Sequence, residues 1–351
     1  QNCKEYTKRQ LSLIKVEAVF FPLIIAMIGT STILTVYIGG IESVNGNISS
    51  GNIAEFIIYV NMLAWPVASI GWITSLIQRA AASQKRINEL LEKPLDITNL
   101  TQNKTQINGD IEFRNISFSY DKKVPNILNN INFTIKQGDK IGIFGETGSG
   151  KSTLLNLICR MQEPKSGEII IGGQNIKKLN LYNLRNAISY VPQDGYLFSG
   201  TIKENITFGS DIISNKKLNQ SIRLAEIEDD IKRFDSKLNT LIGERGVQLS
   251  GGQKQRLAIA RALYKETNIY ILDDCMSAID ANKEKSILKN LNEWMEGKTV
   301  ILVSHRISTL ANTDHIIVLK NGQIIEEGNH KGLLQANGLY AKMYIKQQHN
   351  E

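Results

Sequence analysis

The sequence contains little cysteine and little proline. Its 351 residues include 3 cysteines and 6 prolines, and the cysteines, at positions 3, 159 and 275, are too widely spaced for a disulfide framework or a cluster of thiolate metal ligands. Cys159 and Cys275 therefore favour a reducing compartment for the part of the chain that carries them. Hydrophobic residues make up 42% of the chain, which excludes the disordered, collagen-like and low-complexity classes of protein.

Runs of basic residues are also absent. The formal net charge is +7, but no stretch of five or more consecutive basic residues occurs. A solvated basic surface therefore explains the charge better than a nucleic-acid-binding surface does. We expect no nucleic-acid partner.

Lysine and arginine do not occur between Lys15 and Arg79. Within that window, residues 18–41 and 56–77 carry no charged side chain. Each run is long enough, at about 1.5 Å per helical residue, to cross roughly 30 Å of hydrocarbon. Two adjacent runs of this length favour membrane spans over buried helices of a soluble core.

Basic residues flank this pair of runs and are missing between them, so both ends should lie in the cytoplasm. The sequence thus predicts a helical membrane hairpin over residues 1–94, with spans at about 16–41 and 54–78 and a cytoplasmic extension on either side. We expect a multi-pass protein of the cell membrane, in contact with lipid.

The rest of the chain has the pattern of an α/β domain. Residues 95–109 are polar and without periodicity, and we interpret them as a linker. From 110 to 351, short apolar runs such as 140–144 and 269–272 alternate with helical segments. This alternation predicts an α/β nucleotide-binding domain on the cytoplasmic side.

A glycine-rich loop in this domain matches G-x-x-x-x-G-K-[ST]. It spans Gly145–Ser152, follows the strand-like KIGIF and precedes the helical STLLNLICRM, which is the context that supports a phosphate-binding loop over a chance glycine-rich turn. Backbone N–H groups would converge on phosphate oxygens at the helix N-terminus. Lys151 would supply a cation and Ser152 a hydroxyl ligand for Mg²⁺. The nucleotide-binding residues expected here are Gly145, Glu146, Thr147, Gly148, Ser149, Gly150, Lys151, Ser152 and Thr153.

A second apolar run, Ile269–Asp274, ends in two carboxylates. A carboxylate at the end of such a strand can hold Mg²⁺ through its water shell. We assign this role to Asp273, so ATP and Mg²⁺ are the expected ligands of the domain.

The string LSGGQ at 249–253, followed by KQRLAIARAL, makes the family recognisable, and GERG at 243–246 is similar to an element of its exporters. The chain resembles an ATP-binding-cassette (ABC) exporter half-transporter of the multidrug type. The resemblance implies a P-loop ATPase domain with a mixed sheet core and an inserted helical subdomain at about 194–265. Such half-transporters have six spans, and this chain opens with Gln, so we expect a C-terminal part holding the last two spans.

The resemblance also implies roles for single residues. Tyr120 would stack on adenine, Gln193 would touch Mg²⁺ and the attacking water, and His305 would be the switch histidine near the γ-phosphate. Asp280, which ends the loop SAID, would contact the site of a partner subunit. The signature would close over ATP held by that partner, through Ser250, Gly251, Gly252 and Gln253.

Two subunits are therefore needed, because each ATP would be held by one phosphate loop and the opposite signature. ATP would bind the closed dimer more tightly than the open one and so drive closure, while hydrolysis would release it. The partner would be a second half-transporter. The sequence does not identify the transported substrate.

Asp274 departs from the family pattern, in which the residue after the Mg²⁺ carboxylate is Glu. The catalytic carboxylate is thereby withdrawn by one methylene, and a misplacement of about 1 Å can cost on the order of a hundredfold in rate.

The first hypothesis is thus an exporter subunit whose own site turns over slowly beside a partner bearing Glu, with a homodimer as the alternative. The second is an ATP-held regulatory subunit that leaves hydrolysis to its partner. A soluble importer or DNA-repair ATPase is the third, and the two charge-free runs argue against it.

The charge-free runs predict that the chain stays in the membrane fraction during extraction with alkaline carbonate. Spans held by hydrocarbon do not depend on the ionic contacts that this treatment disrupts. Recovery of the chain in the soluble fraction would contradict the membrane hairpin and support the third hypothesis.

Overall fold

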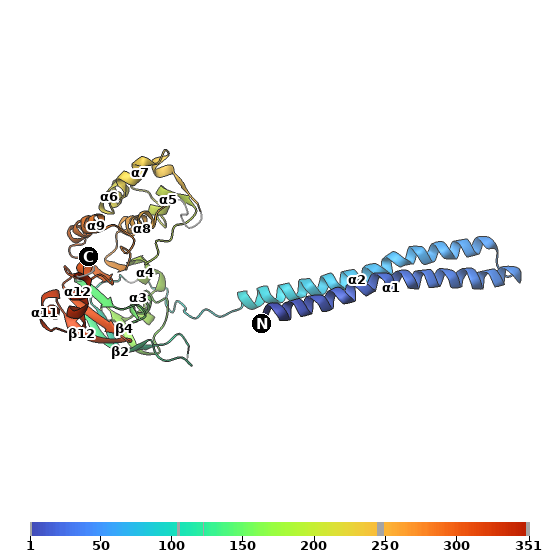
Figure 1. Cartoon of the computed structure of the whole chain (residues 1–351), viewed down its shortest axis with the longest axis horizontal. Helices are drawn as coiled ribbons and strands as arrows, with labels where there is room; N and C mark the ends of the chain where they lie inside the picture. The colour runs from blue at the N-terminus through green and yellow to red at the C-terminus, as the bar shows by residue number, and fades with distance from the viewer. Residues whose placement is uncertain (1, 104–105, 122, 244–248, 349–351) are drawn as a thin grey trace. The chain divides into compact units, whose positions relative to one another are not determined.

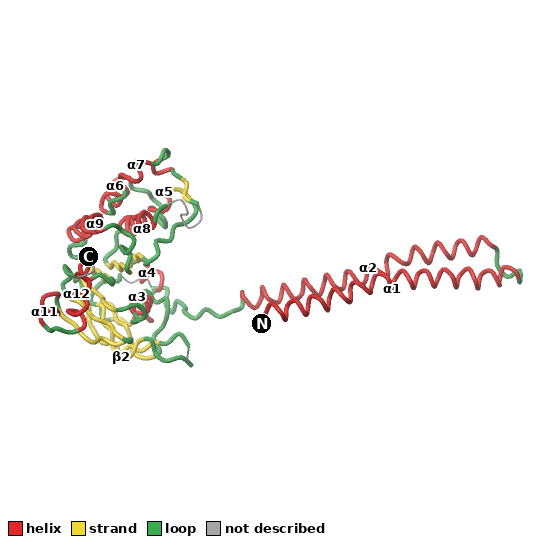
Figure 2. Tube along the Cα trace, in the orientation of Figure 1, coloured by secondary structure: helices red, strands yellow, loops and turns green. Residues whose placement is uncertain are grey.

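The computed structural model describes residues 2–103, 106–121, 123–243 and 249–348. The chain divides into two compact units, Gln1–Leu95 and Asp96–Glu351 (Figure 1). The described residues of the first unit form two helices joined by a short turn, and the second unit combines helices with sheets, as Figure 2 shows. The predicted fold class, a helical hairpin followed by an α/β domain, is confirmed.

The first unit consists of two long antiparallel helices, α1 (Asn2–Val44) and α2 (Ser50–Leu91). The 43 residues of α1 would measure about 65 Å at the usual helical rise, twice the thickness of a hydrocarbon core, so each helix is longer than one span. Both helices are long and apolar enough to cross a membrane, and none of their most apolar stretches is buried within the protein. Lipid is the environment that suits such exposed apolar surface.

Local sequence explains how the hairpin turns and packs. Gly46 adopts a φ of +80°, which glycine tolerates best, and α2 begins with a capping box. In this box the Asn52 N–H donates to the Ser49 hydroxyl and the Ser49 N–H donates to the Asn52 side chain at 3.0 Å. A Cβ at Gly71 would lie 3.0 Å from the Phe20 ring, so a small residue permits the close approach of the two helices.

The second unit is built on a six-stranded sheet in the order β12-β11-β3-β10-β9-β6. The strands pair in parallel except for β11 and β12, which are antiparallel. Their bounds are β3 Lys140–Gly145, β6 Ile188–Val191, β9 Ile269–Asp273, β10 Thr299–Val303, β11 His315–Lys320 and β12 Gln323–Gly328.

Two smaller sheets complete the strands of this unit. One is antiparallel, in the order β2-β1-β4-β5, and the other is the pair β7-β8. Their bounds are β1 Ile111–Phe118, β2 Leu128–Ile135, β4 Ser166–Ile171, β5 Gln174–Asn175, β7 Gly200–Thr201 and β8 Leu241–Ile242.

The helices of the second unit fall into two groups. Between β6 and β9 lie α5 (Ile202–Ile206), α6 (Asn215–Leu224), α7 (Glu228–Arg233) and α8 (Gly251–Lys265), which Figure 2 shows on the side away from the main sheets. The others are α3 Lys151–Ile158, α4 Leu181–Asn186, α9 Ala281–Trp294, α10 Ile307–Leu310, α11 His330–Gln335, α12 Leu339–Gln348 and the 3₁₀ turns Ile176–Lys178 and Lys237–Asn239.

Strand β9 illustrates how the six-stranded sheet is buried on both faces. Tyr270 and Leu272 belong to one apolar cluster, shared with α8, α9 and α12, whereas Ile269 and Ile271 belong to another, shared with α3 and the antiparallel sheet. Successive side chains of a strand point to opposite faces, so both faces are covered, as is usual for parallel sheets. This packing fixes the strand ends, which carry the candidate site.

Part of the predicted linker is bound to the second unit. The Thr98 carbonyl accepts from Arg160 Nη2 at 3.2 Å, and the Thr101 carbonyl accepts from Asn180 Nδ2 at 2.9 Å. The Leu181 N–H donates to the Asn99 side chain at 3.0 Å. The absence of periodicity in this stretch therefore reflects irregular backbone held by side chains, rather than backbone without contacts.

Replacing Ile143 by alanine should destabilise the second unit by about 2–5 kcal/mol, because the side chain is fully buried in β3 and its removal leaves a cavity. Ile325→Ala on β12 is the control, since that side chain is 44% exposed. The measurement is urea unfolding followed by Trp294 fluorescence, with Trp65 and Trp72 replaced by phenylalanine. Equal shifts in the two variants would contradict the assignment of the core.

Candidate functional site

Glycines give the phosphate loop its shape where β3 ends and α3 begins. Gly148 and Gly150 have φ values of +82° and +104°, in the left-handed region that side chains disfavour. A Cβ at Gly145 would collide with the Leu319 carbonyl oxygen and the Ser149 hydroxyl. The turn therefore leaves backbone N–H groups at the N-terminus of α3, which suits an anion.

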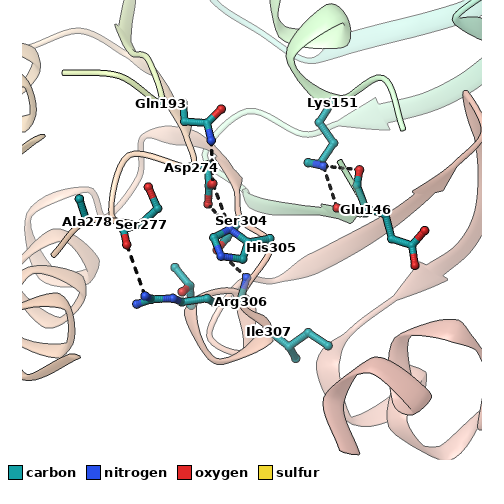
Figure 3. Close-up of polar contacts among 12 residues, drawn as sticks. Glu146, Lys151, Gln193, Asp274, Ser277, Ala278, Ser304, His305, Arg306 and Ile307 are labelled. Carbon is teal, nitrogen blue, oxygen red and sulfur yellow. Dashed lines mark hydrogen bonds and ion pairs between the residues drawn. The ribbon is translucent and has the colours of Figure 1, made fainter. Parts of the chain in front are cut away.

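The cation of the loop is held inside it. Lys151 Nζ donates to the carbonyl oxygens of Gly145 at 2.7 Å and Glu146 at 2.8 Å (Figure 3). Burial lowers the pKa of Lys151, while the nearby charges of Asp274 and Asp273 act in the opposite direction. The buried Ser149 hydroxyl has no hydrogen-bond partner among the described residues. An ammonium and an unpaired hydroxyl in a ring of glycines fit a phosphate group.

Tyr120 and Thr153 extend the site beyond the loop. The Tyr120 hydroxyl lies 3.4 Å from the Thr153 hydroxyl, and Thr153 is buried. The Tyr120 ring contacts Phe118 edge-on, with centroids 4.9 Å apart, and 59% of the residue is exposed. An exposed ring face beside the loop leaves room for the predicted stacking on adenine.

The predicted metal ligands lie only partly together. Asp273 is buried at the end of β9 and accepts from the Tyr190 hydroxyl at 3.1 Å. Burial raises the pKa of Asp273, and the neighbouring hydroxyl groups of Ser152 and Tyr190 oppose this. Gln193 contacts the next carboxylate instead, since its Nε2 donates to Asp274 Oδ2 at 3.4 Å.

The described residues contain no cluster of three or more His, Cys, Asp or Glu side chains that could hold a metal ion alone. A serine hydroxyl beside one buried carboxylate fits Mg²⁺, which commonly binds one or two carboxylates together with substrate phosphates and water. Ser152 and Asp273 would therefore hold it jointly with the phosphates of a nucleotide.

The side chains of Asp274 and His305 contact each other directly. His305 Nδ1 lies 2.9 Å from Asp274 Oδ1 and 3.0 Å from Oδ2, so the ring nitrogen is within hydrogen-bond distance of both carboxylate oxygens. Figure 3 shows Gln193, Asp274 and His305 pointing toward one another. The Asp274 backbone has a φ of +45°, and its N–H donates to the Val303 carbonyl at 2.9 Å. The carboxylate is thus fixed at the sheet edge between an imidazole and an amide.

The signature sequence forms the N-terminus of α8. The Gln253 N–H donates to the Ser250 hydroxyl at 3.3 Å and the Ser250 N–H donates to Gln253 Oε1 at 2.9 Å, a capping box. Ser250 and Gly251 are exposed. The Gln253 side chain is already engaged in the cap, so it orders the helix end at which a ligand would bind.

A buried carboxylate, Asp230 of α7, supports this helix end. It accepts from Gln253 Nε2 at 2.9 Å, from Arg256 Nη1 at 2.7 Å and from Lys283 Nζ at 3.5 Å. Burial raises the pKa of Asp230, but the hydrogen bonds from Arg256 and Gln253 outweigh it and leave the pKa below its usual range. The ionised Asp230 therefore links α7, α8 and α9.

A buried glutamine joins three functional segments. Gln255 Nε2 donates to the Gln193 carbonyl and to the Ser277 hydroxyl, both at 3.1 Å, while its Oε1 accepts from the Ala278 N–H at 2.9 Å. Asp280 caps α9 by accepting from the Lys283 N–H at 3.0 Å. The loops around Gln193 and Ser277 consequently depend on the position of α8.

The predicted site residues thus fall into two groups. Lys151, Asp273, Asp274 and His305 lie at the ends of β3, β9 and β10. Among the described residues, no hydrogen bond or ion pair joins residues 250–253 or Asp280 to residues 145–153. Residues 244–246 of the GERG string lie outside the described residues.

Sequence reasoning missed Asp230 and Gln255. Asp230 lies in the acidic segment EDD, 23 residues before Gln253, and nothing in that segment points to the signature. Gln255 lies two residues after the signature, so its closeness to LSGGQ in the sequence was the available signal.

Comparison with known proteins identifies the family. Residues 128–277 match the family model described as ABC transporter. The chain is 38% identical, over 97% of its length, to the probable multidrug resistance ABC transporter ATP-binding/permease protein YheI of Bacillus subtilis. It is 37% identical, again over 97% of its length, to the multidrug resistance-like ATP-binding protein MdlA of Escherichia coli. In each case it covers 58% of the relative, so the chain spans less than two thirds of the length of these proteins.

A solved structure agrees with these relatives. The structure of a bacterial Atm1-family ABC exporter with ATP bound superimposes with a TM-score of 0.75 and 34% sequence identity. The match covers 86% of this chain and 53% of that one. It therefore extends beyond the region of the family model.

The resemblance predicted from LSGGQ is confirmed by these matches. Homologues with this ATP-binding domain are ATPases coupled to transport, and the multidrug exporters among them are membrane proteins. The two apolar helices α1 and α2 are accordingly candidate membrane helices, and the ATPase domain is cytoplasmic. The C-terminal unit thus contains an ABC transporter ATP-binding domain, and nearly the whole chain is similar to multidrug ABC transporter ATP-binding/permease proteins.

Proposed function

We propose that this chain is part of a half-transporter of an ABC exporter and couples the binding and hydrolysis of ATP to export across the membrane. The observation that carries the proposal is the meeting of Lys151, Asp273 and the Asp274–His305 pair at one edge of the sheet. The family of the chain and its two membrane helices support the link to transport.

ATP would bind with its phosphates in the loop 145–152. The N–H groups of the loop and the Lys151 ammonium would neutralise the phosphate charge, and Lys151 would exchange its two carbonyl partners for phosphate oxygens. Tyr120 would contact the adenine ring. Mg²⁺, held by Ser152 and Asp273, would add further positive charge beside the phosphates.

The proposed partner is a second half-transporter. The exposed N-terminus of α8 carries a serine hydroxyl and glycine N–H groups, which suit a γ-phosphate, yet it makes no hydrogen bond to the phosphate loop of its own chain among the described residues. A mate would bring its own phosphate loop to this helix end, and Asp280 lies on the loop beside it. The Atm1-family structure with ATP bound is the precedent for the fold.

Asp274 would act as the general base toward the attacking water. Its carboxylate is oriented by His305, but in this arrangement both of its oxygens face the imidazole. The side chain is also one methylene shorter than Glu. We therefore infer slow hydrolysis at this site and a faster site on a partner that bears Glu.

A second candidate function is an ATP-held subunit with almost no hydrolysis of its own. The engagement of the Asp274 carboxylate by His305 favours it, because a base that is already hydrogen bonded must exchange that bond to receive a proton. The two candidates differ only in the turnover at this site.

Replacing Lys151 by alanine should weaken ATP binding at least about tenfold, because the half-buried ammonium is the cation of the loop. Titration of the membrane-embedded chain with a fluorescent ATP analogue measures the change. Lys216→Ala, at an exposed position on α6, is the control. Unchanged affinity in the Lys151 variant would contradict the assignment of the phosphate loop.

Replacing Asp274 by glutamate should raise ATP turnover at this site, by up to roughly a hundredfold if reach is the limiting factor. Replacing it by asparagine should remove only the slow activity of this chain. The measurement is single-turnover hydrolysis in the purified assembly. If Asp274→Asn abolishes all turnover and no partner is required, the inference of a weak site is wrong.

A further inference from the structure

The C-terminal helix α12 makes a two-point contact with the backbone around His305. Gln347 Nε2 donates to the His305 carbonyl at 2.6 Å, and Gln347 Oε1 accepts from the Ile307 N–H at 2.9 Å. One side-chain amide thus holds the backbone on both sides of Arg306. The two partners lie about 40 positions earlier in the chain.

This contact supplies hydrogen bonds that α10 lacks. Helix α10 begins at Ile307, and its N-cap residue Arg306 makes no side-chain capping bond. The first N–H groups of a helix have no partner within it, so an outside acceptor is needed. Gln347 is that acceptor for Ile307 and a donor for the adjoining His305 carbonyl. It therefore completes the local hydrogen bonding of the segment that carries the imidazole.

Helix α12 is itself firmly placed. The N–H groups of Leu339 and Tyr340 donate to the Glu326 carboxylate, which caps the helix. Tyr340 is fully buried, with its hydroxyl 2.9 Å from His330 Nδ1 and its ring edge-on to Phe144. Phe144 directly precedes the phosphate loop. Gln347 thus acts from a support that is packed against β3.

We propose that Gln347 is a positioning residue for hydrolysis: by fixing the backbone at His305 it holds the imidazole against Asp274. The inference rests on the proposed ATPase function. His305 Nδ1 reaches Asp274 Oδ1 at 2.9 Å only if the His305 backbone stays in place, and 54% of its side chain is exposed, so the surroundings do little to restrain the ring. The amide of Gln347 supplies that restraint.

The loop should remain folded when Gln347 is changed. Arg306 is anchored on its other side by an ion pair with the buried Glu284, whose second oxygen accepts from the Thr309 hydroxyl at 2.6 Å. Loss of the Gln347 contacts should therefore loosen His305 without unfolding α10. Among the described residues, Gln347 makes no hydrogen bond to residues 145–153, so ATP affinity should be unaffected.

The experiment compares Gln347→Ala, Gln347→Glu and the control Gln348→Ala in the full chain. Gln348 neighbours Gln347 on α12, but its amide bonds the Tyr344 hydroxyl at 2.7 Å and not the His305 segment. Hydrogen exchange is measured by mass spectrometry on peptides covering residues 304–310, without nucleotide. ATP hydrolysis by the assembled transporter, with the partner's own site inactivated, then gives kcat and KM for the site of this chain, in the wild-type background and in a His305→Ala background.

For Gln347→Ala we expect exchange of the 304–310 peptides to accelerate about fivefold to tenfold, because the Ile307 N–H loses its acceptor, an ordinary hydrogen bond. We expect kcat to fall by a similar factor with KM unchanged, and no further fall in the His305→Ala background. Gln347→Glu keeps the acceptor for Ile307 but loses the donor to His305, so it should retain more protection than Gln347→Ala while kcat still falls. Gln348→Ala should change neither quantity.

Unchanged exchange in Gln347→Ala would overturn the inference, as would accelerated exchange with wild-type kcat. A Gln347→Glu variant with wild-type kcat would show that the donor to His305 is dispensable, and an equal loss of kcat in the His305→Ala background would show that Gln347 does not act through His305. The exchange measurement needs no ATP. A wild-type assembly that does not hydrolyse ATP would therefore overturn the proposed function, separately from these outcomes.

Discussion

The site depends on one constraint, which is that parallel strands deliver their carboxyl ends to the same edge of a sheet. Strands β3, β10 and β9 are neighbours, and they end at Gly145, Val303 and Asp273. The residues that follow these three ends are the phosphate loop, the segment of His305, and Asp274. The phosphate loop thus meets segments that lie more than a hundred residues later in the chain, because these three strands pair in parallel and are buried on both faces.

A second layer of polar contacts turns this edge into an arrangement of defined geometry. Side-chain amides make several of these contacts, since one amide group can donate one hydrogen bond and accept another at the same time. Gln255 joins the loops of Gln193 and Ser277, Gln253 caps α8, and Gln347 spans the His305 segment. Each amide binds backbone groups that would otherwise lack partners. Neutral side chains therefore hold the loops around Gln193, Ser277 and His305 in addition to the ionic contacts of the site.

Much of the fold was predictable because its signals are local. The phosphate loop has a fixed spacing between a strand and a helix, and the charge-free runs 18–41 and 56–77 identify α1 and α2 without any tertiary information. The position of Asp273 at the end of a buried strand was predictable from the apolar run that precedes it. These features need only one window of sequence.

The supporting contacts were not predictable in this way. Gln193 and Gln255 are 62 residues apart, Asp230 and Gln253 are 23 apart, and His305 and Gln347 are 42 apart. Polar residues on helix surfaces carry no periodic signal that distinguishes a buried partner from a solvated one. The contacts of the linker were likewise not predictable. Within its residues 98–101, the Thr98 carbonyl accepts one hydrogen bond from Arg160, and the Thr101 carbonyl accepts one from Asn180.

The backbone at Asp274 has one further consequence. Its φ of +45° lies in the left-handed region, where aspartate and asparagine are found far more often than other residues with a Cβ. Longer side chains forced into this region carry strain of about 1–2 kcal/mol. At position 274, aspartate thus causes less backbone strain than glutamate would, whereas the glutamate carboxylate would reach further from the backbone. Asp274 therefore combines a main chain under little strain with a short side chain. Replacing it by glutamate would lengthen the side chain and add backbone strain.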